Sequence, residues 1–172
     1  MDEQLKKTIR SIPDFPKKGI LFRDITTLLK DKKAFTEAIN LLVSRHKGKG
    51  IDKIVGMESR GFILGAPMAY LLGAGFVPVR KKGKLPGESY KATYELEYGS
   101  DHLEIHKDAI ERGEKVLIVD DLLATGGTAV ATIELVQNFD AKIHGLDFLI
   151  ELEDLNGRDK LKKFDVFSLI KF

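Results

Sequence analysis

The chain contains no cysteine and, over its 172 residues, only four histidines and three methionines. Without cysteine, disulfide bonds, thiolate metal sites and a cysteine nucleophile are all excluded. So few imidazole and thioether groups also leave little from which a transition-metal site could be built. We therefore expect neither a cysteine-based site nor a transition-metal site.

A charge excess and long apolar runs are missing as well. The 28 lysines and arginines nearly balance the 26 aspartates and glutamates, so the formal net charge is only +2. Proteins that bind nucleic acids through phosphate contacts usually carry a clear basic excess, so we expect no nucleic-acid partner. No apolar run approaches the ~18 residues of a membrane span, and none of signal-peptide length follows the N-terminus. We expect a cytoplasmic protein without membrane contact.

The hydrophobic residues, 43% of the chain, are enough for a single core. Strand-like runs cover residues 51–57, 75–80, 116–119 and 143–150, and helical spacing covers 2–12, 34–42 (with Asp31 as N-cap), 61–72 and 128–139. This order predicts an α/β fold in which helices flank a central, mostly parallel sheet with right-handed crossovers. No repeat or linker divides the chain, so we expect one domain over residues 1–172.

Residues 83–107 interrupt this alternation. Residues 93–98 and 103–105 alternate polar with apolar side chains on either side of a Gly-Ser turn. The pattern predicts a β-hairpin that projects from the sheet, and an appendage of this size often acts as a lid. His102, Glu104 and His106 should share one solvent-facing side of it, which argues against a metal site there.

The strongest local pattern is V-L-I-V-D-D-L-L-A-T-G-G-T at residues 116–128, with a helix to follow. The buried strand places Asp120 and Asp121 at its carboxyl end, where parallel α/β sheets bind ligands. An ionised carboxylate only accepts hydrogen bonds, so the pair suits vicinal sugar hydroxyls or a hydrated cation.

The turn that follows the acids has the features of a phosphate site. Its backbone N–H groups would converge at a helix N-terminus, with the hydroxyls of Thr125 and Thr128 close by and with Gly126 and Gly127 permitting close approach. No lysine follows the glycines, so the turn is not a Walker A loop. A chance succession of two acids and two glycines stays open as an alternative. If the succession is not due to chance, the acids and the turn together predict that the site binds a five-carbon sugar that carries a phosphate.

This strand, acid pair and T-G-G-T turn resemble the 5-phosphoribosyl 1-diphosphate (PRPP) motif of the type I phosphoribosyltransferases. The resemblance implies that Asp120 and Asp121 contact the ribose hydroxyls and that the 5′-phosphate is held by Ala124, Thr125, Gly126, Gly127 and Thr128. It also implies the fold of that family, with the hairpin as lid and a small hood made by the two ends of the chain. Mg²⁺ would be the cofactor, reached by the two aspartates directly or through water, and the protein would be a homodimer.

Five further segments are similar to the adenine-specific branch of this family: residues 15–25, 58–62, 80–87, 96–99 and 155–161. Enzymes for 6-oxopurines carry an aspartate at the position of Ala124, and alanine cannot exchange a proton. The resemblance therefore implies purine salvage, in which PRPP and adenine give AMP and pyrophosphate with inversion at the anomeric carbon. A xanthine or other purine phosphoribosyltransferase and a PRPP-sensing regulator without catalysis stay open.

The same resemblance assigns roles outside the turn. Glu97 and Tyr98 would close over the site with the lid, and Arg60, Arg80, Lys81 and Lys84 would meet the pyrophosphate. Leu21 and Leu152 would sandwich adenine, while the backbone of residues Leu21, Phe22 and Arg23 reads its edge. Each has a plainer interpretation: Arg60 paired to Glu58, a solvated basic loop, a solvent-facing Glu97, and two leucines of the core.

Overall fold

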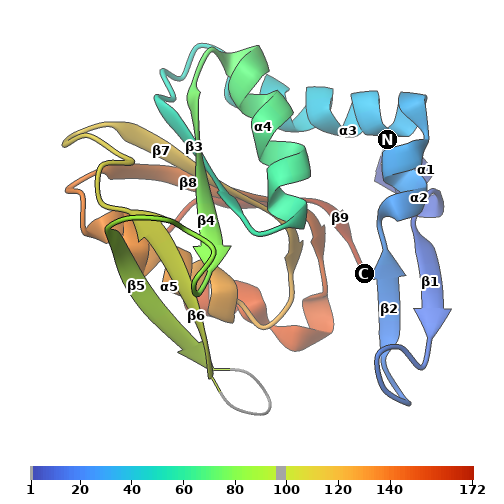
Figure 1. Cartoon of the computed structure of the whole chain (residues 1–172). Coiled ribbons are helices and arrows are strands. Elements are labelled where there is room, and N and C mark those ends of the chain that lie inside the picture. Colours follow the sequence, from blue (N-terminus) through green and yellow to red (C-terminus); the bar gives the residue numbers. More distant parts are fainter. Residues whose placement is uncertain (1, 96–99) are drawn as a thin grey trace.

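Seven strands form the central sheet of the computed structural model, which describes residues 2–95 and 100–172. Their order is β5-β6-β4-β3-β7-β8-β9 (Figure 1). The neighbouring strands β4, β3, β7, β8 and β9 run parallel to one another, whereas β6 pairs antiparallel with both β4 and β5. The strands are β3 (Lys53–Met57), β4 (Gly75–Lys81), β5 (Ser89–Glu95), β6 (Ser100–His106), β7 (Lys115–Leu123), β8 (Lys142–Glu151) and β9 (Val166–Lys171). The expected mostly parallel α/β fold is confirmed.

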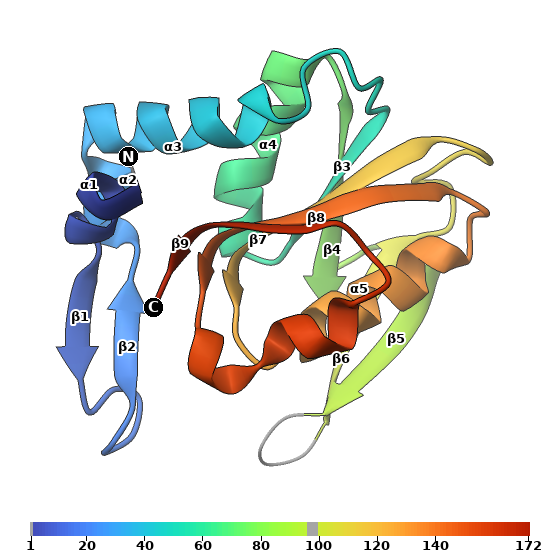
Figure 2. The same cartoon turned by 180° about the vertical axis from the view of Figure 1, so that it is seen from behind.

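Helices cover both faces of this sheet, as Figures 1 and 2 show from opposite sides. One face carries α4 (Arg60–Leu72), against which α3 (Lys32–Ser44) packs, and the other carries α5 (Gly127–Gln137). Strand β7 is buried on both faces, because Leu117 and Val119 join the core beside α4 while Val116 and Ile118 join the core beside α5. This explains its uninterrupted apolar run. Asp31 caps α3 as expected, accepting the N–H groups of Lys33 and Ala34.

The N-terminal prediction is half wrong. Helix α1 ends at Lys7 (Asp2–Lys7), and Arg10–Pro13 forms β1, which pairs antiparallel with β2 (Leu21–Asp24) before α2 (Thr26–Lys30). Pro13 disfavours helical geometry at the residue before it, and an ion pair between Arg10 and Asp24 ties the two strands together. The apolar spacing that predicted a helix to residue 12 could not reveal this pairing.

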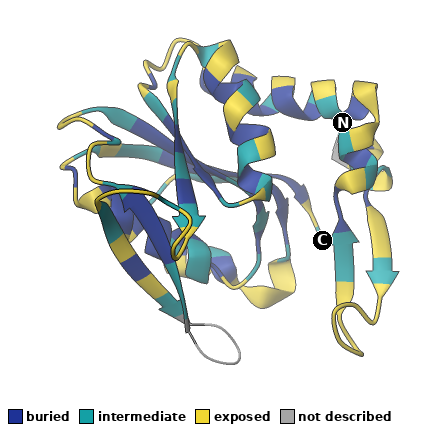
Figure 3. Cartoon of the chain, viewed as in Figure 1, coloured by how far each residue is buried: buried dark blue, intermediate teal, exposed yellow. Residues whose placement is uncertain are grey.

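The β1–β2 hairpin stands beside the sheet and meets the other end of the chain (Figure 1). The ring of Phe172 lies 3.9 Å from the guanidinium carbon of Arg23 and 4.7 Å from the ammonium group of Lys6. Much of the hairpin's surface is exposed, as Figure 3 shows. The expected hood from both ends of the chain is therefore present, and the Phe172 ring contacts help to hold it.

The hairpin of β5 and β6 is present but does not project freely. Arg80 pairs with Glu104 and Lys81 with Leu103, so the hairpin continues the sheet at its edge. The expectation that Glu104 faces solvent is wrong, because its residue is 3% exposed and its carboxylate accepts the N–H of Gly83 at 3.1 Å. The turn with Glu97 and Tyr98 lies outside the described residues.

Two short 3-10 helices, η1 (Glu153–Leu155) and η2 (Gly157–Leu161), connect β8 to β9. Within the described part of the chain, no helix has the length and apolar character needed to cross a membrane.

Candidate active site

A cavity of about 250 Å³ opens at the carboxyl ends of β3 and β7. At about 30 Å³ per water molecule, it holds roughly eight waters and so has the size of a small-ligand site. Its walls combine the start of α4, the end of β4, the β5–β6 hairpin and the turn from β7 to α5. They include Arg60, Lys81, Asp120, Asp121, Ala124, Thr125, Gly126, Gly127 and Thr128, all of which the sequence pointed to.

The two aspartates lie within β7, which runs on to Leu123 and is longer than expected. Asp121 is buried, and its Oδ2 lies 2.9 Å from Nε of Arg60. Loss of hydration raises the pKa of both carboxyls; the negative charge of Asp121 adds to the effect on Asp120, and Arg60 opposes the effect on Asp121. An incoming positive or hydrogen-bonding group would therefore stabilise the ionised form of the pair.

Arg60 does not pair with Glu58, so that plainer interpretation is wrong. Its place at the start of α4 depends on Gly61, where a Cβ atom would lie 2.8 Å from the carbonyl oxygen of Val119 and 3.0 Å from Oδ1 of Asp120. Only glycine lets the helix begin this close to β7. Arg60 also faces the hood, with its guanidinium carbon 5.8 Å from the centroid of the Phe22 ring.

The phosphate turn is supported from behind by a second glycine. Gly126 has a left-handed φ of +79°, and α5 begins directly after it. A Cβ atom at Gly157 would lie 2.1 Å from the carbonyl oxygen of Ala124 and 2.9 Å from the nitrogen of Gly126. Backbone thus packs on backbone. From the sequence, Gly157 was notable only as part of the family-like segment 155–161, and nothing nearby marked it as a support of the turn.

Arg158 fixes the segment that carries Gly157. Its guanidinium group binds both carboxylate oxygens of Glu151, at 2.9 and 2.6 Å, and donates to the carbonyl of Val166 at 2.7 Å. Hydrogen bonding from Arg158 lowers the pKa of Glu151, which keeps the pair ionised. The end of β8 and the start of η2 are therefore held together behind the turn.

Three cations at and after the end of β4, Arg80, Lys81 and Lys84, are paired to acids. Lys84 Nζ lies 2.6 Å from Glu58 Oε1, and Arg80 Nε lies 3.2 Å from Glu58 Oε2. Lys81 Nζ lies 3.2 Å from Asp101 Oδ2 and is the member of the predicted trio that lines the cavity. The segment is exposed, as a solvated loop would be, but its cations are held by acids. Glu58 is a residue of the cavity wall that sequence reasoning treated only as a partner for Arg60.

Tyr94 was also missed. It lines the cavity from β5, and its hydroxyl donates to Asp101 Oδ2 at 3.1 Å. Burial, and after it the charge of Asp101, raises the pKa of Tyr94 to about 12, so the phenol stays protonated. The alternation of the hairpin was a signal for it, since Tyr94 follows the buried Ala92 by two positions.

The residues expected at adenine sit beside the cavity rather than in its wall. Leu21 is 47% exposed on β2, so it is not a core residue. Arg23 donates to Ser11 Oγ at 2.5 Å and stacks on Phe172, in keeping with a role in holding its segment. Leu152 is partly buried, and its N–H donates to the carbonyl of Leu123 at 2.9 Å, next to the end of β7.

Comparison with known proteins gives consistent matches. A model of the phosphoribosyl transferase domain matches residues 24–171. The adenine phosphoribosyltransferase of Geotalea uraniireducens (strain Rf4) is 60% identical over 172 residues, 100% of both chains. The crystal structure of adenine phosphoribosyltransferase from Thermoanaerobacter pseudethanolicus has a TM-score of 0.96 at 56% identity and 100% coverage of both chains. That from Saccharomyces cerevisiae, complexed with an imino-altritol bisphosphate and adenine, has a TM-score of 0.93 at 47% identity, covering 98% of this chain and 97% of that one.

Proposed function

The chain belongs to the phosphoribosyltransferase family, and from this premise we propose that it transfers the 5-phosphoribosyl group of PRPP to adenine, giving AMP and pyrophosphate. The observation that carries this assignment is the cavity in which an acid pair, Arg60 and the Thr-Gly-Gly-Thr turn meet. Such an enzyme is a pentosyl transferase of purine salvage. The named relatives at up to 60% identity support adenine as the base.

The residues around the cavity suggest an orientation for the donor. The turn of residues 124–128 would bind the 5′-phosphate through its N–H groups and hydroxyls at the start of α5. Asp120 and Asp121 would accept the ribose hydroxyls, and Arg60 and Lys81 would face the pyrophosphate from the other wall. Arg80 and Lys84, at the edge of the cavity beside Glu58, would contact the pyrophosphate as well. These cations stabilise the charge that grows on pyrophosphate as the bond to the anomeric carbon breaks.

The acceptor would lie between the hood and the end of β7. Ala124 offers no group that could exchange a proton with the base, which supports adenine over a 6-oxopurine. The backbone of residues 21–23 would read the edge of the ring, with Leu21 on one side and Leu152 on the other. Phe22, which already faces Arg60, links this end of the site to the pyrophosphate end.

Mg²⁺ fits the oxygen groups of this cavity. No cluster of three or more metal-binding side chains occurs among residues 2–95 and 100–172. Mg²⁺, however, keeps several waters and typically uses one or two carboxylates together with substrate phosphates. Asp120 and Asp121 supply such a partial set, directly or through water. When bound, the ion would add positive charge at the leaving pyrophosphate.

A panel of bases tests the assignment. The protein is incubated with PRPP, Mg²⁺ and each of adenine, hypoxanthine, guanine and xanthine, and the nucleotides are separated by chromatography. We expect AMP from adenine, little product from the other bases, and none when EDTA replaces Mg²⁺. Product from xanthine alone would favour the xanthine enzyme. PRPP binding without turnover of any base would favour a regulator.

Glu97 is proposed to move the purine proton as N9 attacks the anomeric carbon. Glu97→Ala should lower the single-turnover rate by about 10²- to 10⁴-fold, the range of general acid–base catalysis, while PRPP binding changes little. Glu95→Ala, two positions earlier in the hairpin, is the matched control and should react normally. An unchanged single-turnover rate for Glu97→Ala would remove this residue from the mechanism. Tyr98 would help to close the site and exclude water.

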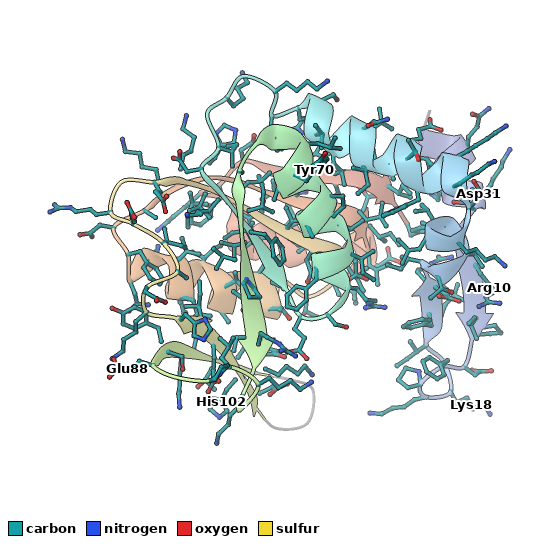
Figure 4. All side chains as sticks on the ribbon, turned by 45° about the horizontal axis from the view of Figure 1, so that its top comes forward. Arg10, Lys18, Asp31, Tyr70, Glu88 and His102 are labelled. Atoms are coloured by element: carbon teal, nitrogen blue, oxygen red, sulfur yellow. The ribbon has the colours of Figure 1, made fainter. Side chains whose placement is uncertain are left out.

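A homodimer is proposed on the outer face of α4. Residues 61–72 contain no charged side chain, yet Ile63, Tyr70 and Leu71 are 42%, 86% and 49% exposed. Tyr70 is labelled in Figure 4. An apolar helix face of this kind is typical of a surface that a second subunit covers. Because α4 begins at Arg60, such a contact would also brace the active site.

Tyr70→Glu should convert the dimer into monomers, since it buries a charge in an apolar interface. Sedimentation analysis of the wild type, of Tyr70→Glu and of Asn40→Glu on the exposed side of α3 measures this. We expect only the first substitution to halve the mass. A monomeric wild type, or a Tyr70→Glu dimer, would contradict the proposed interface.

One domain over residues 1–172 and a cytoplasmic location stay predictions from the sequence.

A further inference from the structure

Glu58 gathers three donors of the basic segment at the edge of the cavity. Its side chain is 8% exposed and follows the end of β3. Oε1 binds the ammonium group of Lys84 at 2.6 Å, and Oε2 accepts the N–H of Lys81 at 2.9 Å and Nε of Arg80 at 3.2 Å. One carboxylate therefore engages two of the cations that the proposed function assigns to pyrophosphate.

The carboxylate is a permanent anion at neutral pH. Burial acts to raise the pKa of Glu58, but the hydrogen bonds from Lys84, Lys81 and Arg80 outweigh it and bring the value to about 2. Arg80 and Lys84 are 34% and 52% exposed, so both cations can be reached from outside while they remain bound to Glu58. Pyrophosphate offers the same kind of acceptor, a charged oxygen, with more charge and more oxygens.

We propose that Glu58 is a positioning residue that exchanges Arg80 and Lys84 with pyrophosphate. It holds both cations before the donor binds and takes them back as pyrophosphate leaves. The inference rests on the proposed function, in which the two cations contact pyrophosphate. Because the product must compete with a carboxylate already in place, its affinity is lowered and its release is faster than the cations alone would allow.

A simpler role would be to hold the segment in shape, and a second buried acid separates the two roles. Glu104 is 3% exposed and accepts the N–H of Gly83 at 3.1 Å, while its other oxygen lies 3.5 Å from Lys91 Nζ. The Glu104 carboxylate thus holds the same loop as Glu58 but does not bind the side chain of Arg80 or Lys84. Removing its charge tests the support of the loop alone.

The test compares Glu58→Gln, Glu104→Gln and Glu88→Gln in the full chain with Mg²⁺. Glu88, labelled in Figure 4, is exposed, and its carboxylate pairs with Lys107 rather than with either of the two cations. Inorganic pyrophosphate is the probe, and the readouts are its inhibition constant against PRPP, together with kcat and KM. We expect Glu58→Gln to lower the inhibition constant about fivefold to tenfold and to reduce kcat where product release limits turnover. Glu104→Gln should raise the inhibition constant of pyrophosphate or leave it unchanged, and Glu88→Gln should leave it unchanged.

An unchanged or raised inhibition constant in Glu58→Gln would overturn the exchange. If this variant does not fold, Glu58→Asp replaces it, because the shorter side chain withdraws the carboxylate from Lys84; the change should have the same sign and be smaller. The double variant Arg80→Met with Lys84→Met tests the underlying contact. If it binds pyrophosphate as tightly as the wild type, the proposed function is wrong at these residues. If it binds more weakly while Glu58→Gln shows no gain, only the exchange fails.

Discussion

Replacing both Asp120 and Asp121 with asparagine is expected to lower kcat/KM for PRPP by about 10³-fold or more. The amide groups donate where the ribose hydroxyls need an acceptor, and Arg60 loses the carboxylate that lies 2.9 Å from its Nε. Thermal unfolding should change much less than activity, since burial raises the pKa of both carboxyls and so opposes their charged form in the free protein.

Steady-state kinetics with varied PRPP measure the effect. The matched control removes the same two charges at exposed positions, as Asp108→Asn with Asp140→Asn, and should react normally. Near-normal turnover in the variant of Asp120 and Asp121 would refute their role at the ribose.

Gly157→Ala is expected to have the next largest effect on activity, through packing alone. The new methyl group would lie 2.1 Å from the carbonyl oxygen of Ala124, so the turn or η2 has to move. A misplacement of about 1 Å in a catalytic site can cost about 10²-fold in rate, and overpacking typically costs about 1–3 kcal/mol of stability. KM for PRPP should rise, because the displaced turn binds the 5′-phosphate.

Gly75→Ala is the comparison for this variant. Its methyl group would meet the flexible side chain of Lys53, at 2.9 Å from Cδ, rather than backbone. That side chain can turn away, so Gly75→Ala should keep its activity and lose little stability. If Gly157→Ala reacts like Gly75→Ala, the backbone contact does not hold the phosphate turn.

These two experiments differ in what the sequence could foresee. Asp120, Asp121 and the turn form one continuous stretch, so strand burial, acid chemistry and glycine geometry could be read locally. Gly157 meets Ala124 only because β8 and its loop return to the same end of the sheet. A contact between residues so far apart in the chain leaves no periodic trace.

Partner choice was the other part that local patterns could not reveal. Arg60 and Glu58 are two positions apart in the sequence, which suggested an ion pair between them. In the structure, however, Arg60 binds Asp121, and Glu58 binds Arg80 and Lys84. In the same way, residues 10–13 have helical spacing but gain more from pairing with β2. Both outcomes depend on what lies across from a residue rather than beside it.

The root of the hairpin sets a mechanical limit on how the site can close. Because Arg80 and Lys81 pair with Glu104 and Leu103, a rigid swing of the whole hairpin would tear its ladder from the sheet. Beyond this root the hairpin also rests on α5, since Ala92, Leu103 and Ile105 lie in the core that this helix shares. The root contains Arg80 and Lys81 themselves, so a movement of the hairpin as a whole would displace these two cations with it.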